Sequence, residues 1–151
     1  MEAESYENPD LASFINENFV PLGVHINENR KNFHRFDVVW TPTVLVSNAD
    51  GKERYRLEGY LSKDEFRAFL EMGLGRVAFM KKDFANAEKH YSNVLDQNPD
   101  SHFAPEAVYY RGVSNYSSTH DHTVLADVAK TFTEKYQDSE WALKSVPWLN
   151  E

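Results

Sequence analysis

The chain has 151 residues, of which 41% are hydrophobic and 26% are charged, and this is the composition of an ordinary globular protein. Its 24 acidic and 16 basic residues give a formal net charge of -8, which would repel a nucleic-acid backbone, so we expect no nucleic-acid partner. The chain contains no cysteine and therefore cannot form a disulfide, bind a metal through thiolates or exchange disulfides by itself.

The hydropathy pattern excludes a membrane protein. No apolar run approaches the roughly 18 residues that cross a bilayer, and residues 1–6 are acidic and polar, unlike a secretion signal. We therefore expect a cytoplasmic protein with no membrane partner. The length suffices for one compact domain or for two small units that share a core, and we expect a single connected body.

The first 36 residues predict a helix, a strand and a second helix. Residues 9–18 place apolar side chains on one helical face, with Asn8 as the N-cap and Pro9 in the first turn. Residues 22–26 are apolar and follow Pro21, so they predict a strand. In the polar segment 27–36, Phe33 and Phe36 predict a short amphipathic helix that packs two rings inward.

The next segment predicts a hairpin that leads into helices. Residues 43–47 form a Val/Leu run typical of a strand buried on both faces, and residues 48–51 predict a turn with Gly51 at positive φ. Residues 53–58 alternate as the returning strand. Ser62 and Glu65 then predict a capping box at the start of a long helix, and the rest of the chain is helical in pattern.

The order strand, helix, Thr-Pro-Thr, strand, turn, strand, Gly59, helix resembles the C-terminal part of a thioredoxin fold. In that family the matching proline, here Pro42, follows a cis peptide bond. A cis bond turns the preceding backbone outward, so that its N–H and C=O groups can pair with an extended substrate. The resemblance therefore implies a peptide-binding wall at Trp40, Thr41, Pro42 and Thr43.

The N-terminal segment, residues 1–22, resembles the sequence just after the C-x-x-C pair of a thioredoxin-like family. On that basis the first strand and the two cysteines would lie upstream of Met1. In the family, the strand before C-x-x-C lies between the strands that match residues 22–26 and 43–47. Without it, those strands must close up or expose unpaired edges, so a homodimer through these edges is one expectation.

Residues 73–100 resemble one tetratricopeptide repeat. Small residues would let two antiparallel helices approach, aromatic residues would fill around them, and a proline would end the second helix. The positions that match are Leu74, Gly75, Phe84, Ala87, Tyr91 and Pro99. Residues 138–142 repeat the pattern of residues 100–104 more weakly. Between these two segments, Pro105 is expected to start a helix in which Gly112 again permits close packing.

The resemblance leaves two roles open for these helices. Tetratricopeptide proteins generally bind peptides or partner proteins in a concave groove, but fewer than three repeats are present, so the helices could instead complete the core of the sheet. The aromatic residues of this region favour core packing over a binding groove, and Trp148 is the one most expected to face a partner. This aromatic set comprises Tyr109, Tyr110, Tyr116, Trp141 and Trp148.

Other chemical candidates are weak. His120 and His122 flank Asp121 in a polar loop without a third ligand at a recognisable spacing, so we expect no metal and no cofactor. His25 and His34 are expected to be surface or packing residues. The chain lacks G-x-S-x-G, H-E-x-x-H and Gly-rich phosphate-loop motifs, and no catalytic residue is assigned.

The sequence thus predicts an α/β fold with an all-α tail, in which a partial thioredoxin-like βαββα unit over residues 1–70 precedes tetratricopeptide-like antiparallel helices over residues 71–151. The expected function is a redox-inactive scaffold that binds a peptide or a protein. One alternative is a shortened thiol-disulfide oxidoreductase, in which the first cysteine of an upstream pair would attack a substrate disulfide. A second alternative is a purely structural subunit.

Overall fold

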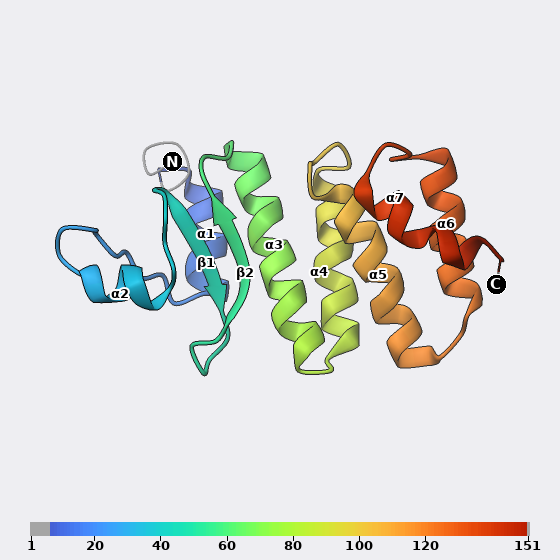
Figure 1. The fold of residues 1–151 in the computed structure, drawn as a ribbon, viewed down its shortest axis with the longest axis horizontal. Coiled ribbons are helices and arrows are strands. Elements are labelled where there is room, and N and C mark those ends of the chain that lie inside the picture. The colour runs from blue at the N-terminus through green and yellow to red at the C-terminus, as the bar shows by residue number, and fades with distance from the viewer. Residues whose placement is uncertain (1–6, 151) are drawn as a thin grey trace.

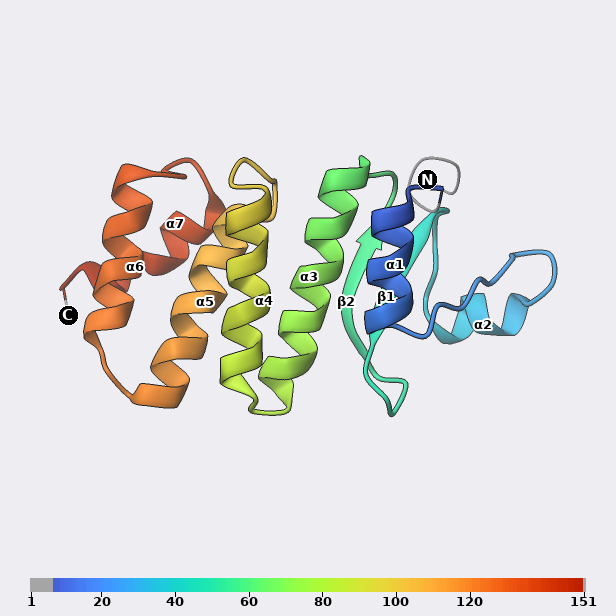
Figure 2. The ribbon, with the colours of Figure 1, turned by 180° about the vertical axis from the view of Figure 1, so that it is seen from behind.

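The computed structural model describes residues 7–150, and its elements are arranged along one long axis (Figure 1). A two-stranded sheet lies near the N-terminal end, with α1 behind it (Figure 2), and helices follow one after another toward the C-terminus. The elements are α1 (Pro9–Asn18), α2 (Arg30–Arg35), β1 (Thr43–Ser47), β2 (Glu53–Glu58), α3 (Lys63–Met80), α4 (Phe84–Gln97), α5 (Ala104–Thr119), α6 (Thr123–Glu134), α7 (Glu140–Ser145) and the 3-10 helix η2 (Val146–Asn150).

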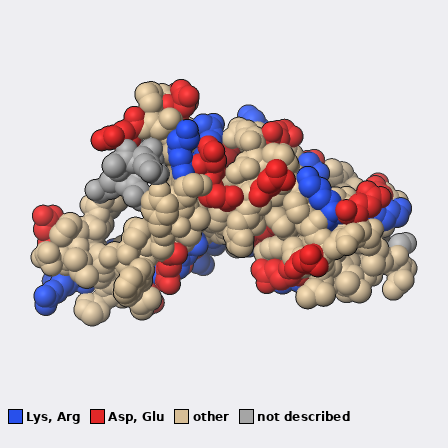
Figure 3. Space-filling model, turned by 90° about the horizontal axis from the view of Figure 1, so that it is seen from above, with Lys and Arg blue, Asp and Glu red and all other residues tan. Residues whose placement is uncertain are grey.

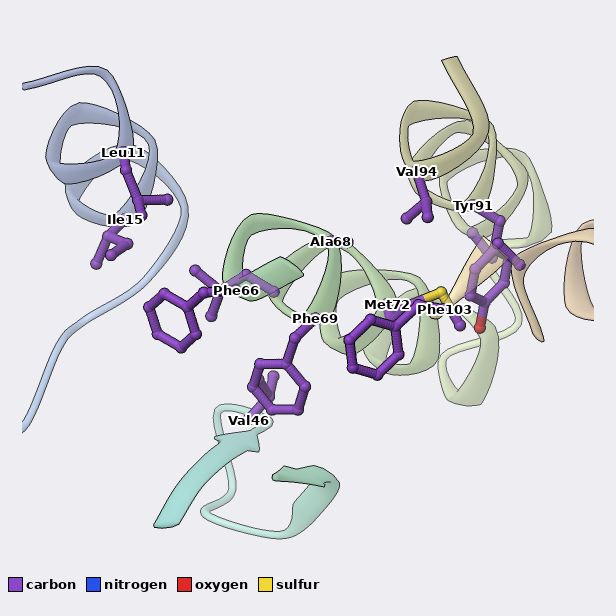
Figure 4. Close-up of a cluster of buried hydrophobic side chains, with 13 residues drawn as sticks. Leu11, Ile15, Val46, Phe66, Ala68, Phe69, Met72, Tyr91, Val94 and Phe103 are labelled. Atoms are coloured by element: carbon purple, nitrogen blue, oxygen red, sulfur yellow. The ribbon is translucent and has the colours of Figure 1, made fainter. Parts of the chain in front are cut away.

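Helix α1 forms where the sequence predicts it. The Asn8 side chain accepts a hydrogen bond of 3.0 Å from the Leu11 N–H, which satisfies one of the free donors of the first turn. Leu11 and Ile15 are buried one turn apart and join the main core. The helix therefore closes the core on the side opposite to the helical tail (Figure 4).

The strand predicted at residues 22–26 is wrong. Among the described residues this segment pairs with no strand, and residues 20–31 are all exposed. Val20 and Leu22 keep 96% and 82% of their surface accessible to water. The reason is physical, because an apolar pattern becomes a strand only when a neighbouring strand supplies hydrogen bonds to its backbone.

Helix α2 is present, but its rings do not reach the core as predicted. Phe33 and Phe36 are half-buried and belong to neither hydrophobic cluster of the described residues. The helix has six residues, none of them buried. It lies at the outer end of the molecule, beyond the sheet (Figure 1), where no other helix or strand of the described residues packs on the rings.

The sheet is a hairpin with the predicted turn. Strands β1 and β2 pair antiparallel, from Thr43 opposite Glu58 to Ser47 opposite Glu53, with an irregularity after Val46. Gly51 in the connecting turn has φ of +76°, as predicted. The expectation that β1 is buried on both faces is wrong, since Val46 is its one buried residue; β1 is paired on one edge, so the strand is only half covered.

Helix α3 joins the sheet to the tail through two glycines on opposite faces. A Cβ atom on Gly73 would lie 2.6 Å from Val46 Cγ2, and a Cβ atom on Gly75 would lie 2.6 Å from Tyr91 Cε1. The helix therefore packs closely on β1 with one face and on α4 with the other. Residue 70, where the sequence places a domain boundary, lies in the middle of this helix.

The capping of α3 differs in part from the predicted box. The Ser62 hydroxyl accepts a hydrogen bond from the Glu65 N–H, as expected. The Glu65 carboxylate, however, accepts from the Ser101 hydroxyl at 2.8 Å and from the His102 N–H at 3.1 Å. It thus binds the loop before α5 rather than its own helix start, which ties the sheet unit to the tail.

The tail consists of antiparallel helices, and its small residues mark the closest contacts. Ala87 and Tyr91 are buried against α3, and Gly112 of α5 leaves space for Val128 of α6, whose Cγ2 would be 2.2 Å from an added Cβ. Phe84 is half-buried and meets Phe79 edge-on at 5.3 Å. Leu74 is half-buried, and Pro99 follows the end of α4. Whether these helices are tetratricopeptide repeats stays a prediction.

One continuous core connects the two regions. Figure 4 shows Val46 of β1 beside Phe69 of α3, and Met72 of α3 on the side of the cluster where Tyr91 and Phe103 lie. A second cluster of Val108, Val128 and Phe132 lies farther along the tail. Because the main cluster includes buried side chains from both sides of residue 70, the sheet and the first tail helices stabilise each other.

Candidate functional site

The predicted wall is a tight corner between α2 and β1. The Thr43 hydroxyl donates a hydrogen bond of 2.6 Å to the Trp40 carbonyl, and the Gly59 N–H donates one of 2.8 Å to the Pro42 carbonyl. The Thr41–Pro42 peptide bond is cis. These contacts hold residues 40–43 against the end of β2, so the four predicted residues do lie together.

The corner presents both an aromatic surface and free backbone groups. Trp40 is 69% exposed, and Thr41 and Pro42 are also exposed. Within residues 7–150, the N–H and C=O groups of Thr41 have no hydrogen-bond partner. An extended chain can pair with such groups while a side chain packs on the indole ring.

Arg56 of β2 holds the loop between α2 and this corner in place. Its guanidinium donates to the Phe36 carbonyl and, at 3.4 Å, to the Asp37 carbonyl, which end α2. Glu53 binds the same guanidinium at 2.6 Å, and this hydrogen bond raises the pKa of Arg56 above its ordinary value. The arginine stays charged, and it clamps the loop that leads into Trp40 to the sheet.

Further apolar side chains are exposed at this end of the molecule. Besides Trp40, they are Val20, Leu22, Val24, Ile26 and Val39, and their exposed fractions range from 37% to 96%. Most of them lie in the segment that fails to form a strand. A group of exposed apolar side chains beside unpaired backbone is a feature of surfaces that bind another chain.

A polar cluster that no sequence motif predicts joins the sheet to the tail. The Tyr55 hydroxyl donates a hydrogen bond of 2.7 Å to Glu106, and Arg76 lies 3.8 Å from the other carboxylate oxygen. The Arg76 guanidinium also stacks over Tyr110 at 4.3 Å. These residues are far apart in sequence and follow no motif, so no local spacing could have revealed them.

Burial governs the protonation of this cluster. Desolvation raises the pKa of Glu106, although the Tyr55 hydrogen bond and the Arg76 charge oppose the shift. Desolvation also raises the pKa of Tyr55 and of Tyr91. The Tyr91 hydroxyl is buried without a hydrogen-bond partner in the described part of the chain. The cluster joins α3, α5 and β2.

The histidines of the polar loop lie around an aromatic ring. His120 ends α5 in the left-handed conformation, and the rings of His120 and His122 lie 6.2 Å and 5.1 Å from that of Tyr116. The Asp121 carboxylate accepts two hydrogen bonds from Thr123, which lower its pKa. Over residues 7–150 no group of three or more His, Asp or Glu side chains is arranged to hold a metal ion.

The aromatic residues of the tail pack on one another. Trp148 stacks on Tyr109 with ring centroids 4.7 Å apart, and Trp141 lies 5.1 Å from Tyr109 and 5.4 Å from Tyr110. Trp148 is therefore half-buried in the second cluster, and its predicted role of facing a partner is not favoured by its position. Leu143 and Val146 of the same end are more exposed, at 74% and 51%.

Comparison with known proteins identifies the N-terminal half of the chain. Residues 1–73 match the family model described as a thioredoxin-like domain. No curated protein and no solved structure matches the chain. In the part of the chain that the structure describes, no helix is long and apolar enough to span a membrane.

Proposed function

We propose that this chain, whose residues 1–73 match the thioredoxin-like domain family, is a redox-inactive scaffold that binds an extended peptide or protein segment at the corner of Trp40, Thr41, Pro42 and Thr43. The observation that carries the proposal is the unpaired backbone of Thr41 beside the exposed indole of Trp40. Main-chain hydrogen bonds would supply affinity, and the ring would supply apolar contact.

The absence of cysteine separates this function from disulfide exchange. A thiolate is the nucleophile of that reaction, and the 151 residues contain none. The oxidoreductase alternative therefore concerns residues outside this chain. The chain itself is expected to bind unfolded polypeptide without reducing or rearranging its disulfides.

The tail supports the proposal as a rigid extension of the corner. The Glu65 contacts with Ser101 and His102, together with the Tyr55 to Glu106 hydrogen bond, connect the sheet directly to α5 and the loop before it. A peptide bound at the sheet end and a protein bound on the tail would thus be held at a defined distance. This arrangement suits a scaffold.

The test uses a fluorescein-labelled, carboxymethylated unfolded polypeptide, whose anisotropy reports binding. Trp40→Ala is expected to weaken binding about tenfold or more, because an exposed aromatic anchor contributes strongly to a peptide interface. Leu143→Ala is the matched control, since it removes an equally exposed apolar side chain at the opposite end.

A second variant tests the backbone contact. Thr41→Pro removes the free N–H of Thr41 and is expected to weaken binding as well, with circular dichroism checking that the fold persists. Loss of affinity in Leu143→Ala equal to that in Trp40→Ala would contradict the proposal. A chain that binds no polypeptide and forms a constitutive oligomer would instead support the structural-subunit alternative.

A further inference from the structure

We infer that the segment bound at the corner is a strand with an apolar centre and acidic flanks. This inference rests on the proposed function and names the chemistry of its ligand. Three observations on residues 7–150 carry it: an edge of β1 that pairs with no strand there, the exposed apolar side chains of residues 20–26, and the basic side chains of α2, which form no ion pair within that range.

The backbone geometry calls for a strand rather than a helix. In the described residues β1 pairs with β2 on one edge, and its other edge has no strand. The C=O groups of residues 20–24 and the N–H groups of the same residues except Pro21, which has none, form no backbone hydrogen bond in this part of the chain. Only an extended chain offers N–H and C=O groups along its length to such partners, because a helix satisfies its own.

The side chains call for an apolar centre. The residues Val20, Leu22 and Val24 are spaced by two, so an extended conformation would direct them to one face, and Ile26 follows at the start of a turn. Val39 adds an apolar side chain that is 78% exposed at the entry to the corner. A strand with alternating apolar residues would cover these side chains and remove them from water.

The charges call for acidic flanks. Residues 20–42 carry three basic and two acidic side chains, whereas the rest of the chain holds 13 of the 16 basic and 22 of the 24 acidic ones. Figure 3 shows a blue group and a red group at the α2 end, and blue and red groups side by side over the middle and the helical end. The segment that leads into the corner therefore carries a small net positive charge, although the chain as a whole has a net charge of -8.

The basic side chains of α2 are available to a ligand. Arg30, Lys31 and Arg35 are exposed, and within residues 7–150 none of them forms an ion pair. The guanidinium of Arg35 lies 5.3 Å from the Phe36 ring, close to the loop that leads into Trp40. Acidic residues that flank the bound strand would therefore meet unpaired positive charge.

The experiment compares three fluorescein-labelled peptides that share an alternating Val/Thr centre and carry flanks of Glu, Ser or Lys. The Glu-flanked peptide is expected to bind most tightly, about three- to tenfold better than the Lys-flanked one, because exposed ion pairs are individually weak. This preference should shrink as salt rises from roughly 0.05 to 0.5 M, where exposed charges are screened.

Charge-reversal variants test whether the basic side chains of α2 cause the preference for acidic flanks. The triple variant Arg30→Glu, Lys31→Glu, Arg35→Glu is expected to reverse the order of the Glu- and Lys-flanked peptides. The control variant Lys81→Glu, Lys89→Glu, Lys130→Glu changes the net charge equally on exposed positions of the tail and should keep the original order. If both variants shift the order alike, net charge rather than α2 selects the ligand, and the inference is overturned.

The outcomes distinguish a failure of this inference from a failure of the proposed peptide-binding function. Equal binding of the three peptides would overturn the acidic preference and leave the peptide-binding function intact. Failure of all three, together with failure of the unfolded polypeptide, would overturn both. A dimer in analytical ultracentrifugation that dissociates on Leu22→Ser would show that a second copy occupies this surface, which also overturns the inference.

Discussion

Gly75 of α3 lies directly against the ring of Tyr91 of α4: a Cβ atom at residue 75 would be 2.6 Å from Cε1 of that ring. Tyr91 is 1% exposed and cannot move toward solvent without opening the contact between the two helices. The distance between α3 and α4 at this point is thus set by the absence of one methyl group.

Gly75→Ala is expected to destabilise the protein by about 1–3 kcal/mol, because overpacking outweighs the better helix propensity of alanine. Urea unfolding followed by tryptophan fluorescence measures the change. Gly23→Ala is the control, since no atom lies within 4 Å of its added Cβ. An unchanged midpoint in Gly75→Ala would mean that the ring can shift at little cost.

The contact between Gly112 and Val128 predicts a compensating pair. Gly112→Ala would place its Cβ 2.2 Å from Val128 Cγ2 and is expected to lower stability by about 1–3 kcal/mol. Val128→Ala alone leaves a small cavity. The double variant should be more stable than the sum of the two losses predicts, which a double-mutant cycle in urea measures. Strict additivity would show that the two residues do not touch in solution.

The Glu71 and His90 pair makes a second prediction about the α3–α4 contact. Glu71 is 2% exposed, and its carboxylate lies 2.7 Å from His90 Nδ1 and 3.3 Å from Asn93 Nδ2. His90→Leu removes one of these two partners of a buried carboxylate and is expected to cost about 1–3 kcal/mol. Adding Glu71→Leu should recover most of this loss, because two apolar side chains leave no buried charge.

Calorimetry of the single and double variants tests this explanation. A double variant as unstable as His90→Leu would indicate that packing rather than the unpaired carboxylate causes the loss.

Glu106 predicts how stability depends on pH. Burial raises its pKa in the folded state, so the folded chain binds more protons than the unfolded chain between the ordinary value of 4.5 and the raised one. The contribution of this residue to stability is therefore present below pH 4.5 and is lost as the pH rises through the folded pKa. In Glu106→Gln this loss is expected to disappear.

Urea unfolding of both proteins at several pH values checks the sign. Relative to Glu106→Gln, the wild type should lose stability between pH 4.5 and neutrality. Tyr55→Phe removes a hydrogen bond to the carboxylate and should enlarge that loss, by about 1–2 kcal/mol near neutral pH. A relative gain of stability with rising pH would mean that Arg76 outweighs the burial of Glu106.

The sequence by itself determined the features that depend on near neighbours. Asn8 caps α1, Ser62 caps α3, Gly51 adopts positive φ in the hairpin turn, and Gly112 marks a close helix contact, as their local patterns predict. Each of these depends on hydrogen bonds or sterics within a few residues, or on the need of two helices for a small side chain where they meet. The corner at residues 40–43 was found from a motif of the same short range.

Only the tertiary structure decided what depends on distant partners. Residues 22–26 have the composition of a strand but remain exposed and form none, because strand formation needs a neighbour that local sequence cannot supply. The Glu65 carboxylate accepts a hydrogen bond from Ser101 and not from the start of its own helix, and the Tyr55 hydroxyl donates one to Glu106, which is 51 residues away in the sequence. Such pairings arise from the packing of whole elements, which brings together groups that no spacing along the chain connects.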